Sequence, residues 1–124
     1  MKKSGTLIIA FVGILVLFAA FIKPTDPVPS NAPKGIPDSV WQVISKCCLD
    51  CHATDGNGMA RANVDFDKWD SYTPDKQLAK AQDICNELQQ GKMPPSKYRK
   101  NNPEGVPTES ETARVCNWVR QMEK

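Results

Sequence analysis

The stretch Cys48-Leu49-Asp50-Cys51-His52 has the spacing C-x-x-C-H, and the rest of the chain is best understood from it. Two thiols three positions apart lie on one helical turn, where both can bond to the same flat ring. The pattern is the attachment signature of a c-type haem, in which the following histidine ligates the iron. His52 is also the only histidine of the 124 residues. The motif predicts one covalent haem with thioether bonds to Cys48 and Cys51, and with His52 as proximal iron ligand.

Three other interpretations of the motif are open. A thioredoxin-like dithiol uses C-x-x-C within a βαβ unit, but no strand pattern precedes Cys48. A zinc site needs a second group of closely spaced ligands, whereas Cys85 and Cys116 are single and far apart. Chance occurrence is the third. Haem attachment is the interpretation that uses both cysteines and the histidine, and we favour it.

The N-terminal segment is apolar without interruption from residue 5 to residue 22, GTLIIAFVGILVLFAAFI. A helix of this length reaches about 27 Å, enough to cross the hydrocarbon core of a membrane. Lys2 and Lys3 favour a cytoplasmic N-terminus, so the rest of the chain would be exported. We expect a single-pass inner-membrane anchor with a periplasmic domain. The alternative is a cleaved signal peptide and a soluble periplasmic domain, although no clear cleavage site follows the run.

The composition divides the chain into three parts. Residues 1–23 are the anchor or signal, residues 24–37 form a linker with five prolines, and residues 38–124 form the haem-binding domain. The net charge is +2, which Lys2 and Lys3 account for, so the exported part is formally neutral. With no basic tract interleaved with aromatic residues, nucleic acid is not an expected partner.

The domain should be all-α, because three segments have apolar residues at helical spacing. The first begins at Asp38 as N-cap and runs into the haem motif, with apolar positions Val40, Trp41, Val43, Ile44 and Cys47. The second begins at Thr73-Pro74 and ends at Gly91, with a buried stripe of Leu78, Ala81, Cys85 and Leu88. The third begins with a capping box at Thr108 and has the apolar face Val115, Trp118, Val119 and Met122.

A second iron ligand is expected from methionine, since the chain has no second histidine. Met93 is favoured because it lies between the helix end at Gly91 and two prolines, which make the loop stiff. Met59 lies in a glycine-rich loop close to His52, and Met122 lies on the apolar face of the last helix. A packing role for Met93, with an open iron, is the alternative.

Three further expectations concern the surroundings of the haem. Val64, Phe66 and Trp69 are candidate walls of the haem pocket, although each can equally be a core residue. Basic residues around the methionine loop would attract an acidic redox partner, or would simply be solvated: Lys92, Lys97, Arg99 and Lys100. A disulfide between Cys85 and Cys116 is favoured in an oxidising compartment, although Cys47 can take either partner.

Together these residues resemble the small haem-binding-domain cytochromes c of Bacteroidetes-type bacteria. The resemblance extends from about Val40 to Met122 and includes the C-x-x-C-H motif, the stretch 64–69, the stretch 91–95 and the final Cys116-Asn117-Trp118. Known members have a longer insertion rich in tryptophan and tyrosine after the haem motif, where this chain has a glycine-rich turn. The resemblance implies thioether bonds at Cys48 and Cys51, with His52 and Met93 as the two axial ligands.

The expected function is therefore one-electron transfer by a membrane-anchored monohaem cytochrome c, and not an enzymatic reaction. Two other classes are weighed against it. An open-site haem sensor or peroxidase-like domain is one, but no distal histidine or arginine pair is evident for peroxide chemistry. A membrane-tethered thiol or structural module without haem is the other.

Overall fold

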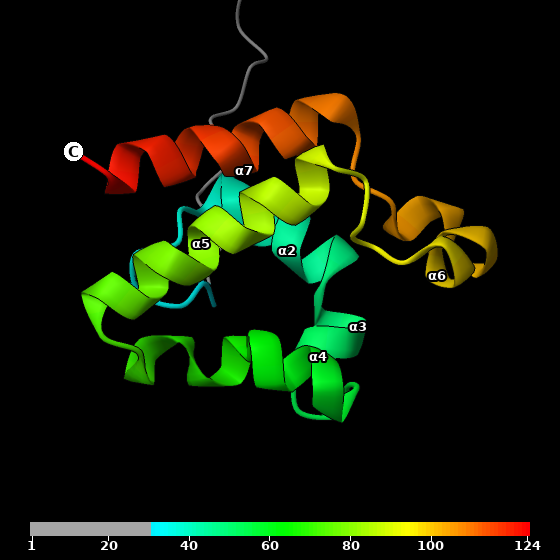
Figure 1. Cartoon of the computed structure of the whole chain (residues 1–124), viewed down its shortest axis with the longest axis horizontal. Helices are drawn as coiled ribbons and strands as arrows, with labels where there is room; N and C mark the ends of the chain where they lie inside the picture. Colours follow the sequence, from blue (N-terminus) through cyan, green and yellow to red (C-terminus); the bar gives the residue numbers. More distant parts are fainter. Residues whose placement is uncertain (1–30) are drawn as a thin grey trace, which may run out of the picture.

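The computed structural model describes residues 31–124, and in this part of the chain the regular elements are helices without any strand. Helix α5 (Pro74–Gln89) and helix α7 (Glu109–Met122) lie side by side, and α2 (Asp38–Cys47) packs against α7 (Figure 1). The shorter elements are α3 (Leu49–His52), α4 (Gly58–Asn63), η1 (Phe66–Ser71), α6 (Ser96–Asn101) and η2 (Pro103–Gly105). The prediction of an all-α domain is confirmed.

The ends of the two long helices have the capping structures that the sequence predicts. The Thr73 hydroxyl accepts a hydrogen bond from the backbone of Lys76, and Pro74 is the first residue of α5. At the other end, Gly91 has φ +64° and the amide of Lys92 donates to the carbonyl of Glu87. Helix α7 begins with a reciprocal capping box between Thr108 and Glu111.

The first helix differs from the prediction at both ends. Pro37 is its N-cap. Asp38 lies in the first turn, where the positive end of the helix dipole stabilises its carboxylate. The helix ends at Cys47 and does not run into the haem motif, because Cys48 has φ −123° and ψ −34°. A separate turn, α3, then begins, and the carbonyl of Cys48 accepts from the amides of Cys51 and His52.

The core lies among α2, η1 and α7, around the fully buried Trp69. Its indole stacks on Phe66 with ring centroids 5.9 Å apart, and it contacts Trp118 at the same separation. Around these rings are buried aliphatic residues of α2 and α7: Val40, Val43, Ile44, Val115 and Val119. Burial of this apolar surface is the main stabilising contribution to the domain.

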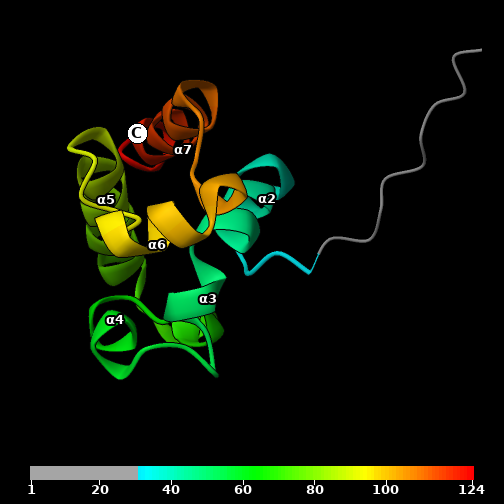
Figure 2. The ribbon, with the colours of Figure 1, turned by 90° about the vertical axis from the view of Figure 1, so that its right-hand side faces the viewer.

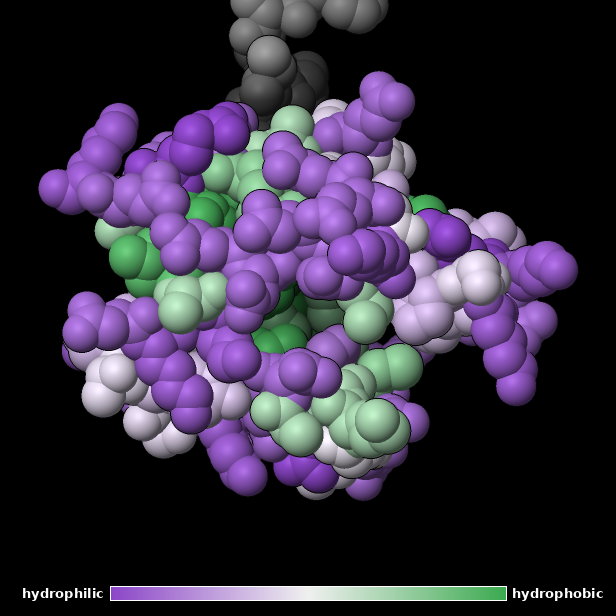
Figure 3. Space-filling model, viewed as in Figure 1, coloured by the Kyte–Doolittle hydropathy of each residue, from purple (hydrophilic) through white to green (hydrophobic). Residues whose placement is uncertain are grey.

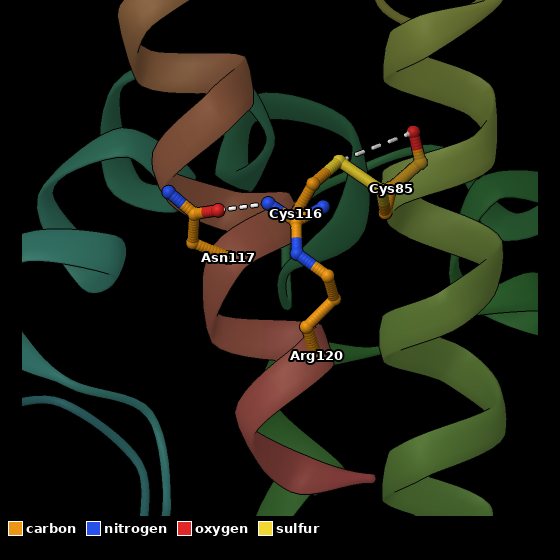
Figure 4. The surroundings of a disulfide bond; sticks show 4 residues. All are labelled: Cys85, Cys116, Asn117 and Arg120. Carbon is orange, nitrogen blue, oxygen red and sulfur yellow. Dashed lines mark hydrogen bonds between the residues drawn. A yellow bond between two sulfur atoms is a disulfide. The ribbon is translucent and has the colours of Figure 1, made fainter.

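The predicted buried stripe of α5 is only partly correct. Ala81 is fully buried, whereas Leu78, Cys85 and Leu88 are half-buried. This incomplete burial has a structural reason, since Leu88 borders the cavity described below. Cys85 is instead bonded to Cys116 of α7, with Cα atoms 5.1 Å apart, as the sequence favours (Figure 4). Cys47 remains a buried free thiol.

The last residues of the predicted linker pack on the helical domain. Ile36 is buried, the carbonyl of Gly35 accepts a hydrogen bond from the indole N–H of Trp118, and the amide of Lys34 donates to Asp70. The predicted anchor, residues 5–22, lies outside the described residues. Among residues 31–124, none of the helices is long and apolar enough to cross a membrane.

Candidate cofactor site

Two adjoining cavities of about 510 and 320 Å³ lie beside the C-x-x-C-H motif. Volumes of this order are usual for ligand and cofactor pockets. Figure 3 shows the recess on one face of the molecule, with apolar side chains visible inside it. The residues that line both cavities come from α3, α4, α5 and the loop after α5: Cys48, His52, Ala60, Asn63, Leu88 and Met93. The structure thus brings Met93 to the same space as the motif.

The imidazole of His52 is oriented by a hydrogen bond to the backbone. Its Nδ1 lies 2.9 Å from the carbonyl oxygen of Val64. A carbonyl oxygen only accepts, so Nδ1 carries a proton, and in the neutral imidazole Nε2 is the nitrogen with the free lone pair. The ring of Phe66 also meets the imidazole edge-on, with centroids 6.4 Å apart. Histidines that ligate metals are commonly held in this way, with the other ring nitrogen bonded to a carbonyl.

A buried ionic network fixes the segment that supplies this carbonyl. Asp65, which follows Val64, is 2% exposed, and its carboxylate accepts from Arg61 at 3.0 Å. Arg61 also donates to the backbone carbonyl of Thr54 at 2.9 Å, so it joins α4 to the turn that follows His52. Sequence analysis missed this network, although the spacing of Arg61 and Asp65 is that of an i,i+4 ion pair.

The two cysteines of the motif are unpaired and half-buried at the cavities. Cys48 lines both cavities, and Cys51 lines the smaller one. Burial raises the pKa of Cys48 to about 12, so its thiol is neutral. Cys47 also borders the smaller cavity, but its side chain is buried in the core, and burial raises its pKa as well.

The other two methionines considered as ligands occupy different surroundings. Met59 does not lie in a loop as predicted: it belongs to α4, because the side chain of Asn57 caps this helix. The side chain of Met59 is 82% exposed, although it borders the smaller cavity. Met122 packs against the core at the end of α7. Met93 is 38% exposed, and its amide donates to the carbonyl of Glu87, which holds it near the end of α5.

The predicted pocket walls separate into two groups. Val64 and Phe66 line the larger cavity, whereas Trp69 lies behind Phe66 in the core. Sequence analysis missed the contribution of α5, whose Ile84 and Leu88 provide an apolar wall. The same helix also gives this cavity a polar border: Lys80, Asp83, Asn86, Glu87 and Gln90.

The predicted docking cations are not equivalent. The guanidinium of Arg99 donates to the carbonyl of Gly91 at 2.7 Å, and the ammonium of Lys92 lies 4.0 Å from Glu87. Lys97 and Lys100 are exposed on α6. Two of the four cations thus have partners within the domain, although Lys92 stays exposed, and the other two are exposed on α6.

The fold and the site define a helical domain with a cavity of cofactor size, an apolar wall on one side and an oriented imidazole in its lining. A comparison with protein families finds a match to the family described as haem-binding domain over residues 57–121, more than half of the chain. The chain belongs to this haem-binding domain family. The match begins after His52, so the C-x-x-C-H motif is a separate indication of haem. No curated protein and no solved structure matches the chain.

Proposed function

We propose that this protein is a monohaem cytochrome c that carries single electrons on the periplasmic side of the inner membrane, anchored by residues 5–22. The observation that carries the proposal is the oriented imidazole of His52, which follows C-x-x-C directly and lines one cavity together with Met93. In this proposal Cys48 and Cys51 form the thioether bonds, and His52 and Met93 are the axial ligands.

Bound haem supplies an iron that exchanges one electron between its ferric and ferrous forms. The chain's own groups then decide what else can happen in the cavity. The Val64 carbonyl holds the proton on Nδ1 of His52 and makes Nε2 a stronger electron-pair donor to a metal. Phe66, Ile84 and Leu88 give the larger cavity an apolar lining. If Met93 holds the iron together with His52, no iron position would remain for a substrate, and this favours a carrier over an enzyme or sensor.

The partner in this proposal is an acidic redox protein. Figure 3 shows an apolar area on the surface over α4. Met59 of this helix is exposed and borders the smaller cavity. Tyr98 of α6 also borders this cavity, and the same helix carries the exposed Lys97 and Lys100. An apolar contact area bordered by positive charge suits a partner with carboxylates around its own cofactor.

The test is the absorption spectrum of the full-length protein produced in a host that attaches haem to C-x-x-C-H. Pyridine haemochrome analysis and intact mass should report one covalent haem, and the mass also shows whether the N-terminal segment is retained. Met93→Ala should abolish the low-spin ferrous form and allow carbon monoxide to bind. Met59→Ala is the matched control and should leave the spectrum unchanged. A colourless protein would refute the haem, and an unaltered Met93→Ala spectrum would refute the ligand.

A further inference from the structure

The segment that carries Met93 is held to the rest of the domain by few contacts. This segment, residues 92–107, contains α6 and η2 and is called the distal arm below. Figure 1 shows that α6 and η2 project to one side of the α5–α7 pair, and Figure 2 shows α6 in front of the other helices. The principal neighbour of α6 is η2, within the arm itself. An arm of this kind needs a specific tie if it is to keep Met93 at the cavity.

One side-chain hydrogen bond joins the distal arm to the haem motif. The hydroxyl of Tyr98 in α6 donates to the carboxylate of Asp50 at 2.6 Å. Asp50 is one of the two residues between Cys48 and Cys51, so this bond connects the arm directly to the turn that would hold the haem. The bond from Arg99 to the Gly91 carbonyl, by contrast, reaches only the end of α5.

Tyr98 is closely packed by its neighbours. Its side chain lines the smaller cavity together with Cys51 and Met93. Gly105 is buried against it, and a Cβ at this position would lie 2.7 Å from the hydroxyl oxygen and 3.0 Å from the ring. Only glycine at position 105 leaves enough space for the Tyr98 hydroxyl. A hydroxyl donating to a carboxylate makes a short and comparatively strong hydrogen bond, and this bond raises the pKa of Tyr98 to about 12.

We propose that the hydrogen bond between Tyr98 and Asp50 is a latch that closes the distal arm on the haem motif and so keeps Met93 at the iron. Tyr98 is then a positioning residue for the distal ligand. The inference rests on the proposed function, because it takes Met93 as that ligand. When the latch is broken, the arm swings away more often and the distal side of the cavity opens.

The test compares Tyr98→Phe, which removes only the hydroxyl, with the haem-loaded wild-type chain. Opening of the arm should become about three- to tenfold more frequent, since a hydrogen bond to an exposed carboxylate is lost. Carbon monoxide should therefore bind the ferrous protein faster by the same factor. Asp50→Ala should have the same effect, and the double variant should add little to either. Asp55→Ala, which removes a carboxylate from the turn after the motif, is the matched control and should match the wild type.

A second measurement does not depend on haem chemistry. Hydrogen exchange of the α6 amides, such as those of Arg99 and Asn102, should accelerate in Tyr98→Phe, while the amides of α7 stay protected. Unchanged exchange would overturn the latch, and so would faster exchange without faster carbon monoxide binding.

The latch and the proposed function fail in different ways. If Met93→Ala alters the spectrum but Tyr98→Phe changes neither readout, the latch is wrong and the ligand assignment stands. If Met93→Ala leaves the spectrum unaltered, the ligand assignment is wrong, and with it the role of Tyr98 as a positioning residue.

Discussion

Removal of the disulfide between Cys85 and Cys116 should destabilise the domain strongly. The two cysteines are separated by 31 positions in the sequence, and the bridge joins α5, which forms the cavity wall, to α7, which forms the core. Closing a loop of this length in the unfolded chain stabilises the folded state by about 3–4 kcal/mol in the chain-entropy model. Small domains are stable by only about 5–15 kcal/mol, so the loss is a large fraction of the total.

The measurement is urea unfolding of the double variant Cys85→Ala/Cys116→Ala, followed by tryptophan fluorescence and the haem absorption. With an m value of about 1–3 kcal/mol per molar, the midpoint should fall by roughly 1–4 M urea. Cys47→Ala is the control, since it removes a buried thiol that belongs to no bridge. A double variant that unfolds within about 1 kcal/mol of this control would refute the reasoning, because constraint of the unfolded chain would then contribute little.

Two further predictions concern charged groups. Asp65→Asn removes the buried carboxylate that pairs with the half-buried Arg61 and should cost about 1.5–3 kcal/mol in urea unfolding, whereas Asp55→Asn, at an exposed carboxylate of the turn after the motif, should cost much less. The hydrogen bond from Lys46 lowers the pKa of Glu111 below 4.5, so the stability that ionised Glu111 provides is present above that value and is lost as the pH falls through the lowered pKa. Thermal melts between pH 3 and 6 should show a shallower acid dependence for Glu111→Gln than for the wild type, and equal slopes would contradict the assignment.

The features that could be predicted from sequence are those fixed by local chemistry. Thr73-Pro74 can begin a helix wherever it lies, because threonine accepts a backbone hydrogen bond and proline has no amide to leave unpaired. Gly91 ends the same helix because it adopts a positive φ at no steric cost. The C-x-x-C-H motif is local in the same sense, since Cys48, Cys51 and His52 lie within five consecutive positions, and its assignment to haem stays a prediction.

The features that could not be predicted depend on contacts between distant segments. Helix α6 follows two prolines, contains two lysines and has no apolar stripe, so the sequence pattern gives no sign of its hydrogen bond to Asp50. Phe66 and Trp69 are three positions apart in a 3-10 helix and both are buried in the core, yet Phe66 also lines the larger cavity. From residue type alone, both aromatic residues are equally expected in the core or in a pocket wall. Only the packing partners distinguish them.

The break at Cys48 explains how one chain serves both the core and the cavity. Cys47 is the last residue of α2, is 7% exposed and packs in the core. Cys48 borders both cavities. If α2 continued unbroken, the orientation of the motif would be fixed by the face that α2 buries against α7. Because α3 begins anew from the carbonyl of Cys48, the direction of His52 is set by the Val64 carbonyl and by Phe66. The position of the imidazole is thus determined on the cavity side, by residues whose own position depends on the Arg61–Asp65 network.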